Sequence, residues 1–120
     1  FKAVKGMLGT TFGGNYLAMA AAISVLKIME KEDLVNNALA TGDYLKSAIP
    51  ASDIIKEVRG QGLMLGIEFR EPVKEIRSRL LYEKHIFTGV SGSSTLRLLA
   101  PLCLSIAEAE RFVEALKELI

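Results

Sequence analysis

The sequence has 120 residues, half of them hydrophobic, and a formal net charge of +1 at pH 7. This length suits one domain or part of a larger protein, and the hydrophobic content is enough for a packed core. Acidic and basic residues are mixed along the chain, which argues against a nucleic-acid-binding protein with a basic stripe. No apolar run approaches the roughly twenty residues that a membrane span requires, so we expect neither nucleic acid nor a membrane as a partner.

The first part of the chain predicts two helices in tandem. Residues 15–29 are apolar nearly all round, with Asn15 as the N-cap, so this helix should be buried on most sides. Asp33 is the expected cap of a second helix, and Pro50 should stop it. Its apolar residues recur at roughly helical spacing: Leu34, Ala38, Leu45 and Ile49.

The middle of the chain changes to the period of β-strands. Residues 54–59 predict a short strand, and residues 63–69 alternate between apolar and other positions along a longer one. The segment Gly60-Gln61-Gly62 between them predicts a hairpin turn or a bulged bend. A short amphipathic helix is expected after Pro72, with an apolar side formed by Val73, Ile76, Leu80 and Leu81.

The last third predicts an extended piece beginning at Ile86 and Phe87, a flexible loop over residues 89–94 and a strand over residues 95–99. Ser105 and Glu108 then form a capping box that opens a final helix. The apolar stripe of that helix is Ala109, Phe112, Val113, Leu116 and Ile120. The order helix, helix, strand, strand, helix, strand, strand, helix predicts an α+β fold or an open α/β sandwich, with a small sheet covered by helices.

Two single residues limit the chemistry. Cys103 lies in an apolar run and is expected to be a small core residue. One thiol cannot form an internal disulfide, which favours an intracellular, reducing location. His85 is the only histidine, so we expect no clustered metal site.

The glycine-rich segment RGQGLMLG, residues 59–66, invites comparison with a dinucleotide-binding loop. Strand period rather than helix period follows Gly62, so no helix N-terminus would meet a pyrophosphate. We interpret these glycines as turn chemistry and close backbone packing.

Arg97 is the most informative charged residue. It lies on the opposite strand face from Leu96 and Leu98, in an otherwise uncharged run over residues 91–107. Burying a guanidinium is costly unless an anion meets it, so a partner is implied. That partner could be a glutamate such as Glu68 in a structural ion pair, or a substrate carboxylate held by two parallel hydrogen bonds.

Residues 9–22, GTTFGGNYLAMAAA, place hydroxyl groups and glycines directly before the first predicted helix. Thr10 and Thr11 could hold a phosphate there, because the helix N-terminus carries partial positive charge and glycines let the backbone bend around a ligand. A glycine-rich turn with an Asn cap would give the same residues, and the residues by themselves favour the turn. No conventional catalytic group is visible in the chain, so we expect the reactive group elsewhere.

Three segments in this order resemble the C-terminal part of the class III pyridoxal-phosphate aminotransferases: GTTFGGNYLAMAAAISVLKIME, IKEVRGQGLMLGIEF and LRLLAPLCLS. The resemblance is closest to the branch that acts on acetylornithine, and the branches that act on ornithine and succinylornithine are near neighbours. The resemblance implies a fold-type I homodimer with pyridoxal phosphate at the subunit interface. The chain would supply an interface loop over residues 1–15 and the small C-terminal domain over residues 16–120, with a mainly antiparallel sheet, and would lack the large cofactor-binding domain.

The resemblance also implies roles for three residues. Thr11 matches the threonine that binds the cofactor phosphate of the neighbouring subunit, and Thr10 would support the phosphate or approach the substrate. Arg97 matches the arginine that clamps the α-carboxylate of the substrates. The reaction would move the terminal amino group of N-acetylornithine or N-succinylornithine, through pyridoxal phosphate, to 2-oxoglutarate, in arginine biosynthesis and in the cytoplasm.

The family's Schiff-base lysine has no counterpart in residues 1–8, so we expect the chain alone to be inactive. Tyr16 replaces a common proline and Leu8 a common histidine of the family, which leaves the amino donor open between acetylated, succinylated and free ornithine. The alternatives are another class III aminotransferase, or a non-catalytic α+β interaction module that would dock through the apolar helix over residues 15–29.

Overall fold

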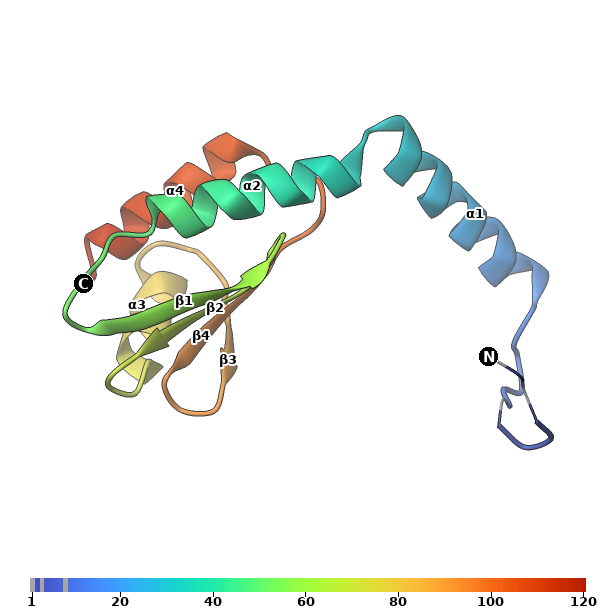
Figure 1. Cartoon of the computed structure of the whole chain (residues 1–120), viewed down its shortest axis with the longest axis horizontal. Coiled ribbons are helices and arrows are strands. Elements are labelled where there is room, and N and C mark those ends of the chain that lie inside the picture. Colours follow the sequence, from blue (N-terminus) through green and yellow to red (C-terminus); the bar gives the residue numbers. More distant parts are fainter. Residues whose placement is uncertain (1, 3, 8) are drawn as a thin grey trace. The chain divides into compact units, whose positions relative to one another are not determined.

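The computed structural model describes residues 2, 4–7 and 9–120, and the chain divides into two compact units, Phe1–Glu32 and Asp33–Ile120 (Figure 1). Leu8 and part of the interface loop expected over residues 1–15 lie outside the described residues. The elements follow the predicted order, with four helices and four strands in the described chain. Among these helices, none is long and apolar enough to cross a membrane.

The first unit contains α1 (Tyr16–Lys31). Its N-cap is Asn15, as predicted, because the side-chain Oδ1 of Asn15 accepts a hydrogen bond of 2.9 Å from the backbone N–H of Ala18. The expectation that this helix is buried on most sides is wrong for this chain, since none of its residues is buried. The reason is that the described part of the first unit contains no second helix or strand to pack against it.

The second unit begins with α2 (Leu34–Ala48). Asp33 stands at the predicted N-cap position, but its side chain makes no capping hydrogen bond. Asp33 instead has the left-handed backbone conformation, with φ 50°, and its carboxylate accepts two hydrogen bonds from the amide of Asn36, at 2.8 and 3.0 Å. The helix ends before Pro50, as predicted, with Ile49 in an extended conformation that suits a residue preceding proline.

The sheet has four strands: β1 (Ile55–Gln61), β2 (Met64–Phe69), β3 (Gly89–Ser91) and β4 (Thr95–Leu99). Their order is β1-β2-β4-β3, and all pairs are antiparallel. The first hairpin turn is shorter than predicted, because Gln61 pairs with Met64 and only two residues connect them. Gly62 in this turn has φ +54°, which a glycine adopts at little cost, so the turn role of this glycine is confirmed.

The third strand differs from the prediction. Ile86 and Phe87 are not in a strand, and β3 begins at Gly89, inside the segment expected to be a loop. The composition of residues 89–94 is typical of a loop, but Val90 pairs with Leu96 of β4 and the ladder holds these residues extended. Only residues 92–94 connect the two strands.

Helices cover one face of the sheet. Figure 1 shows α2 and α4 (Ile106–Lys117) side by side over this face, and the short α3 (Lys74–Tyr82) follows β2. The largest fully buried side chains of the shared core include Leu65, Ile67, Leu80, Leu96 and Leu116. The alternate residues of β2 and β4 lie on the other face, which the helices of this unit leave open.

The final helix begins as predicted. The Ser105 hydroxyl accepts a hydrogen bond from the backbone N–H of Glu108, and the carboxylate of Glu108 accepts one from the backbone N–H of Ser105. Four residues of the predicted stripe are buried and Ile120 is partly buried. Cys103, however, is exposed, so its assignment to the core is wrong. It lies in a turn between β4 and α4, where an apolar sequence run does not place every member inside.

Candidate functional site

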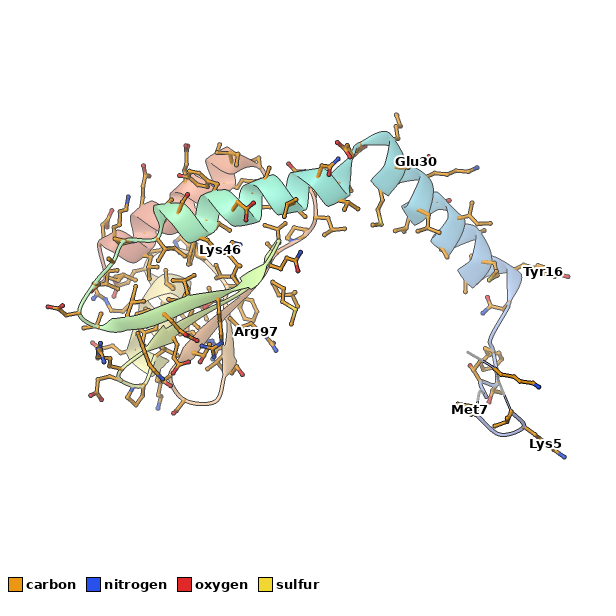
Figure 2. All side chains as sticks on the ribbon, viewed as in Figure 1. Lys5, Met7, Tyr16, Glu30, Lys46 and Arg97 are labelled. Carbon is orange, nitrogen blue, oxygen red and sulfur yellow. The ribbon has the colours of Figure 1, made fainter. Side chains whose placement is uncertain are left out.

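Arg97 lies at the centre of the open sheet face. It pairs with Gly66 of β2 on one side and with Gly89 of β3 on the other. Its neighbours Leu96 and Leu98 belong to the helix-covered face, which confirms the predicted alternation. The side chain of Arg97 is exposed rather than buried, and Figure 2 shows it on the side of the sheet away from α2.

The two glycines that pair with Arg97 place no side chains beside its guanidinium. A Cβ atom at Gly89 would lie 3.0 Å from Nε of Arg97 and 3.2 Å from one of its terminal nitrogens. Gly66 offers no side chain between Arg97 and Arg59, which stands opposite Gly66 on β1. A shallow hollow of about 390 Å³ results, lined among others by Arg59, Gly66, Ser91, Thr95 and Arg97.

Glu68 does not pair with Arg97. Its Oε1 lies 2.6 Å from Nζ of Lys56, and its Oε2 contacts Nη1 of Arg59. The hydrogen bonds from Lys56 and Arg59 lower the pKa of the Glu68 carboxyl below its ordinary value. The structural ion pair considered from the sequence is therefore wrong, and within the described residues Arg97 has no salt-bridge partner. A free guanidinium on an open face can bind a carboxylate through two parallel N–H···O bonds.

The loop before α1 is tight at two glycines. A Cβ atom at Gly13 would lie 2.0 Å from Cγ2 of Thr10, so a larger residue there would displace the Thr10 side chain, and Gly14 has φ +75°. Thr10 and Thr11 are exposed, and the first turn of α1 contains no acidic residue. Hydroxyl groups beside the positive end of a helix fit an anion such as phosphate.

The predicted site residues fall into both units. Thr10 and Thr11 belong to the first unit and Arg97 to the second, so each group is described by itself. The sequence indicated Glu68 only as a possible ion-pair partner of Arg97, and it did not indicate Arg59, Gly66 or Gly89 as site residues. The alternation within each strand places them on one face, but only the register of the strands shows that they surround Arg97.

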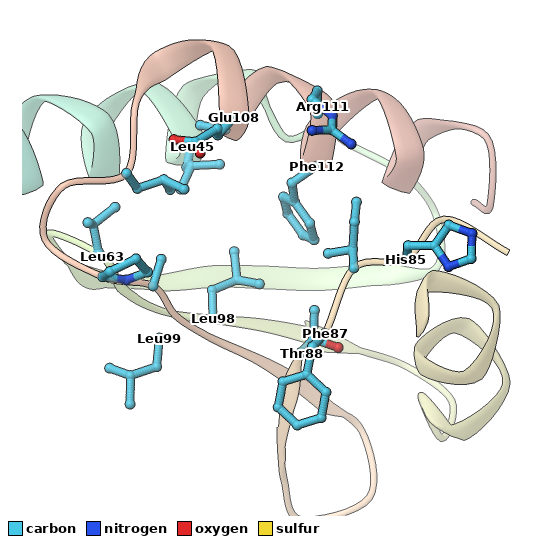
Figure 3. A pocket seen from close by; sticks show the side chains of 15 residues that line it. Leu45, Leu63, His85, Phe87, Thr88, Leu98, Leu99, Glu108, Arg111 and Phe112 are labelled. Atoms are coloured by element: carbon cyan, nitrogen blue, oxygen red, sulfur yellow. The ribbon is translucent and has the colours of Figure 1, made fainter. Parts of the chain in front are cut away.

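A second cavity, of about 370 Å³, lies between α4, residues 85–88 and the end of β4 (Figure 3). Its lining is mainly apolar. Thr88 is buried at its wall, and the hydroxyl of Thr88 has no hydrogen-bond partner among the described residues. His85 also lines this cavity, and it has the left-handed backbone conformation with φ 57°. In the part of the chain that the structure describes, no group of three metal-binding side chains gathers at this cavity or elsewhere.

Comparison with known proteins gives a family match over nearly the whole chain. The family described as "Aminotransferase class-III" matches residues 2–120. The chain is 42% identical over 120 residues to acetylornithine aminotransferase 1 of Bordetella pertussis and covers 30% of that protein. It is 36% identical over 117 residues to the ornithine aminotransferase of Oceanobacillus iheyensis and covers 29% of it. In both comparisons 96% of this chain is aligned.

Solved structures share the fold. A structure of ornithine δ-aminotransferase from Plasmodium falciparum superposes with a TM-score of 0.81 at 32% identity, covering 97% of this chain and 32% of that chain. Acetylornithine aminotransferase from Elizabethkingia anophelis superposes with a TM-score of 0.80 at 27% identity, again over 97% of this chain and 32% of the other.

The chain thus spans about 30% of the length of the curated relatives it matches. Its α+β fold, with a small antiparallel sheet and covering helices, agrees with the fold expected for the small domain of such proteins. The match extends over nearly all of its residues, and the chain belongs to the class III aminotransferases, a family of pyridoxal-phosphate-dependent enzymes.

Proposed function

We propose that these residues are part of a longer aminotransferase that moves the terminal amino group of N-acetylornithine or N-succinylornithine to 2-oxoglutarate. Residues 1–15 would form an interface loop and residues 16–120 the small C-terminal domain, beside a large cofactor-binding domain. The support is that the chain matches the family over residues 2–120 but spans only about 30% of its relatives. Arginine biosynthesis in the cytoplasm is the proposed setting.

The observation that carries the proposal is the open guanidinium of Arg97. Both amino donor and oxo acid acceptor have an α-carboxylate, and a planar fork of N–H donors binds such a group in one orientation. Glu68 is a carboxylate on the same sheet face that could compete for Arg97, but it already pairs with Lys56 and Arg59. Arg97 is therefore the proposed anchor that orients each substrate in turn.

Thr11 is the proposed ligand of a cofactor phosphate, with Thr10 supporting the phosphate or approaching the substrate. Both hydroxyls are exposed beside the N-terminus of α1, and the glycine at position 13 lets the loop close tightly under Thr10. Pyridoxal phosphate, when bound, supplies the electron sink that amino-group transfer requires. Because the family's lysine has no counterpart here, the 120 residues by themselves are proposed to be inactive.

We further propose a homodimer in which Thr11 serves the cofactor of the neighbouring subunit. The apolar side chains of α1 need cover in the longer protein, because Leu17 and Leu26 are 83% and 63% exposed within these 120 residues. The proposed large domain or the second copy of the enzyme would supply that cover.

Free ornithine is the alternative amino donor. The relatives named ornithine aminotransferase match almost as well as those named acetylornithine aminotransferase, with identities of 36% and 42%. Steady-state assays of the full-length protein with acetylornithine, succinylornithine and ornithine, each with 2-oxoglutarate, would identify the donor. Absence of turnover with all three donors would favour another class III aminotransferase or the non-catalytic interaction module instead.

Two substitutions test the assigned residues in the full-length protein. Arg97→Lys should raise the KM for 2-oxoglutarate about ten-fold or more, because a point charge cannot replace two parallel hydrogen bonds. Thr11→Val should weaken pyridoxal phosphate retention, measured by the absorbance of released cofactor, whereas Thr11→Ser should preserve it. Unchanged KM or unchanged retention would refute the respective role.

A further inference from the structure

The position of Glu68 makes it a potential competitor for Arg97. Glu68 pairs with Thr95 on β4, and Arg97 lies two residues further along the same strand and on the same face. Such diagonal neighbours across an antiparallel pair lie about 7–8 Å apart, within the combined reach of two long side chains. Gly66, the direct neighbour of Arg97, has no side chain that would separate them.

The Glu68 side chain nevertheless pairs with two cations of β1, the strand on the other side of β2 from β4. Lys56 contacts Oε1 and Arg59 contacts Oε2, so each carboxylate oxygen has its own partner. The Glu68 side chain is only 19% exposed, which indicates that the pair with the two cations is packed against the sheet rather than free in solvent. Arg59 also contacts Oε1 of Glu57 at 2.5 Å.

We propose that Arg59, assisted by Lys56, is a positioning residue that holds Glu68 away from Arg97 and so keeps Arg97 available for the substrate carboxylate. This inference rests on the proposed function. An internal carboxylate tethered within reach acts at a high effective concentration, and it would compete with a substrate at ordinary concentrations. Any fraction of the protein with Arg97 closed by Glu68 lowers the apparent affinity for carboxylates by that fraction.

The test is a series of variants in the full-length protein, measured by steady-state kinetics with 2-oxoglutarate. Arg59→Gln should raise the KM about five-fold and change kcat less than about two-fold. The reason is that the competing pair between Glu68 and Arg97 forms only in enzyme that has not yet bound 2-oxoglutarate. Adding Glu68→Gln to Arg59→Gln should restore the KM, since the competitor has lost its charge. If the Arg59→Gln protein does not fold, Lys56→Gln is used in its place and should change the KM in the same direction.

Glu57→Gln in the Arg59→Gln background is the matched control. It removes the same charge from the other partner of Arg59, but from β1 rather than from β2 next to Arg97. Glu57→Gln should therefore leave the KM raised. Equal rescue by Glu57→Gln and Glu68→Gln would mean that overall charge is responsible and would overturn the inference, as would an unchanged KM in Arg59→Gln.

Arg97→Lys, measured in the same series, separates this inference from the proposed function. A raised KM in Arg97→Lys together with an unchanged KM in Arg59→Gln rejects the positioning role alone. An unchanged KM in Arg97→Lys rejects the carboxylate anchor itself, and the positioning role with it.

Discussion

Gly89 of the edge strand β3 pairs with Arg97 of β4, and the absence of a side chain at Gly89 leaves the space that the guanidinium of Arg97 occupies. A Cβ atom at position 89 would lie 3.0 Å from Nε of Arg97, closer than ordinary van der Waals contact. The side chain of Arg97 is flexible enough to move, so the sheet can tolerate the added atom. The position of the guanidinium, however, would change.

Gly89→Ala is therefore expected to raise the KM for 2-oxoglutarate in the full-length enzyme about three- to ten-fold without unfolding the protein. The physical reason is that a displaced fork loses the alignment of its two hydrogen bonds, which are stronger than neutral ones only in good geometry. Steady-state kinetics and circular dichroism measure the two effects. Val90→Ala is the control in the same strand, since Val90 follows Gly89 on β3 and pairs with Leu96 rather than Arg97. A similar KM increase in both variants would contradict the role of Gly89 in positioning the guanidinium of Arg97.

Ser105→Ala should destabilise the second unit by about 1 kcal/mol, the usual effect of removing an N-cap side chain. The Ser105 hydroxyl accepts the backbone N–H of Glu108 at the start of α4, and α4 contributes much of the core. Urea unfolding of the chain followed by far-UV circular dichroism measures the change. Ser93→Ala, an exposed serine in the turn between β3 and β4, serves as the control and should leave the midpoint unchanged.

The same cap predicts a pH dependence. The backbone N–H and the hydroxyl of Ser105 donate hydrogen bonds to Glu108 and hold its pKa below the ordinary value of 4.5. A carboxyl whose pKa is lowered on folding stabilises the protein above its unfolded pKa, and the contribution is lost as the pH falls through the folded pKa. The stability difference between wild type and Glu108→Gln should therefore be constant above about pH 5.5 and shrink below about pH 4.5. A difference that does not change with pH in urea unfolding would contradict the assigned hydrogen bonds.

Local rules predicted the parts of this fold that depend on neighbours in sequence. The capping box at Ser105, the stop before Pro50 and the alternation in β2 are each set by residues within a few positions. Asp33 shows the limit of such rules. Its position was predicted, but a left-handed backbone turns its side chain to Asn36 instead of to the helix N-terminus.

The surroundings of Arg97 depend on strand register, which a single sequence does not specify. Arg97 and Gly89 are close only because β3 pairs with β4, and the segment that forms β3 has the composition of a loop. The partners of Glu68 come from β1, and their register depends on a two-residue turn where the sequence predicted a turn of three residues. The sequence therefore identified Arg97 and proposed Glu68 as a partner, but it did not show that Lys56 and Arg59 already hold this carboxylate.

Thr88→Val is expected to stabilise the second unit by about 1 kcal/mol, because a buried hydroxyl without a hydrogen-bond partner has lost its hydration without compensation. Thr88 is 4% exposed and its hydroxyl has no partner within the described chain, whereas its backbone carbonyl accepts a hydrogen bond from Nε of Arg77 that the substitution leaves in place. Thr41→Val is the matched control, since the buried Thr41 hydroxyl donates to the carbonyl of Leu104. Urea unfolding of the chain should therefore show a raised midpoint for Thr88→Val and no increase for Thr41→Val. Destabilisation by Thr88→Val would mean that the hydroxyl has a partner at the wall of the cavity.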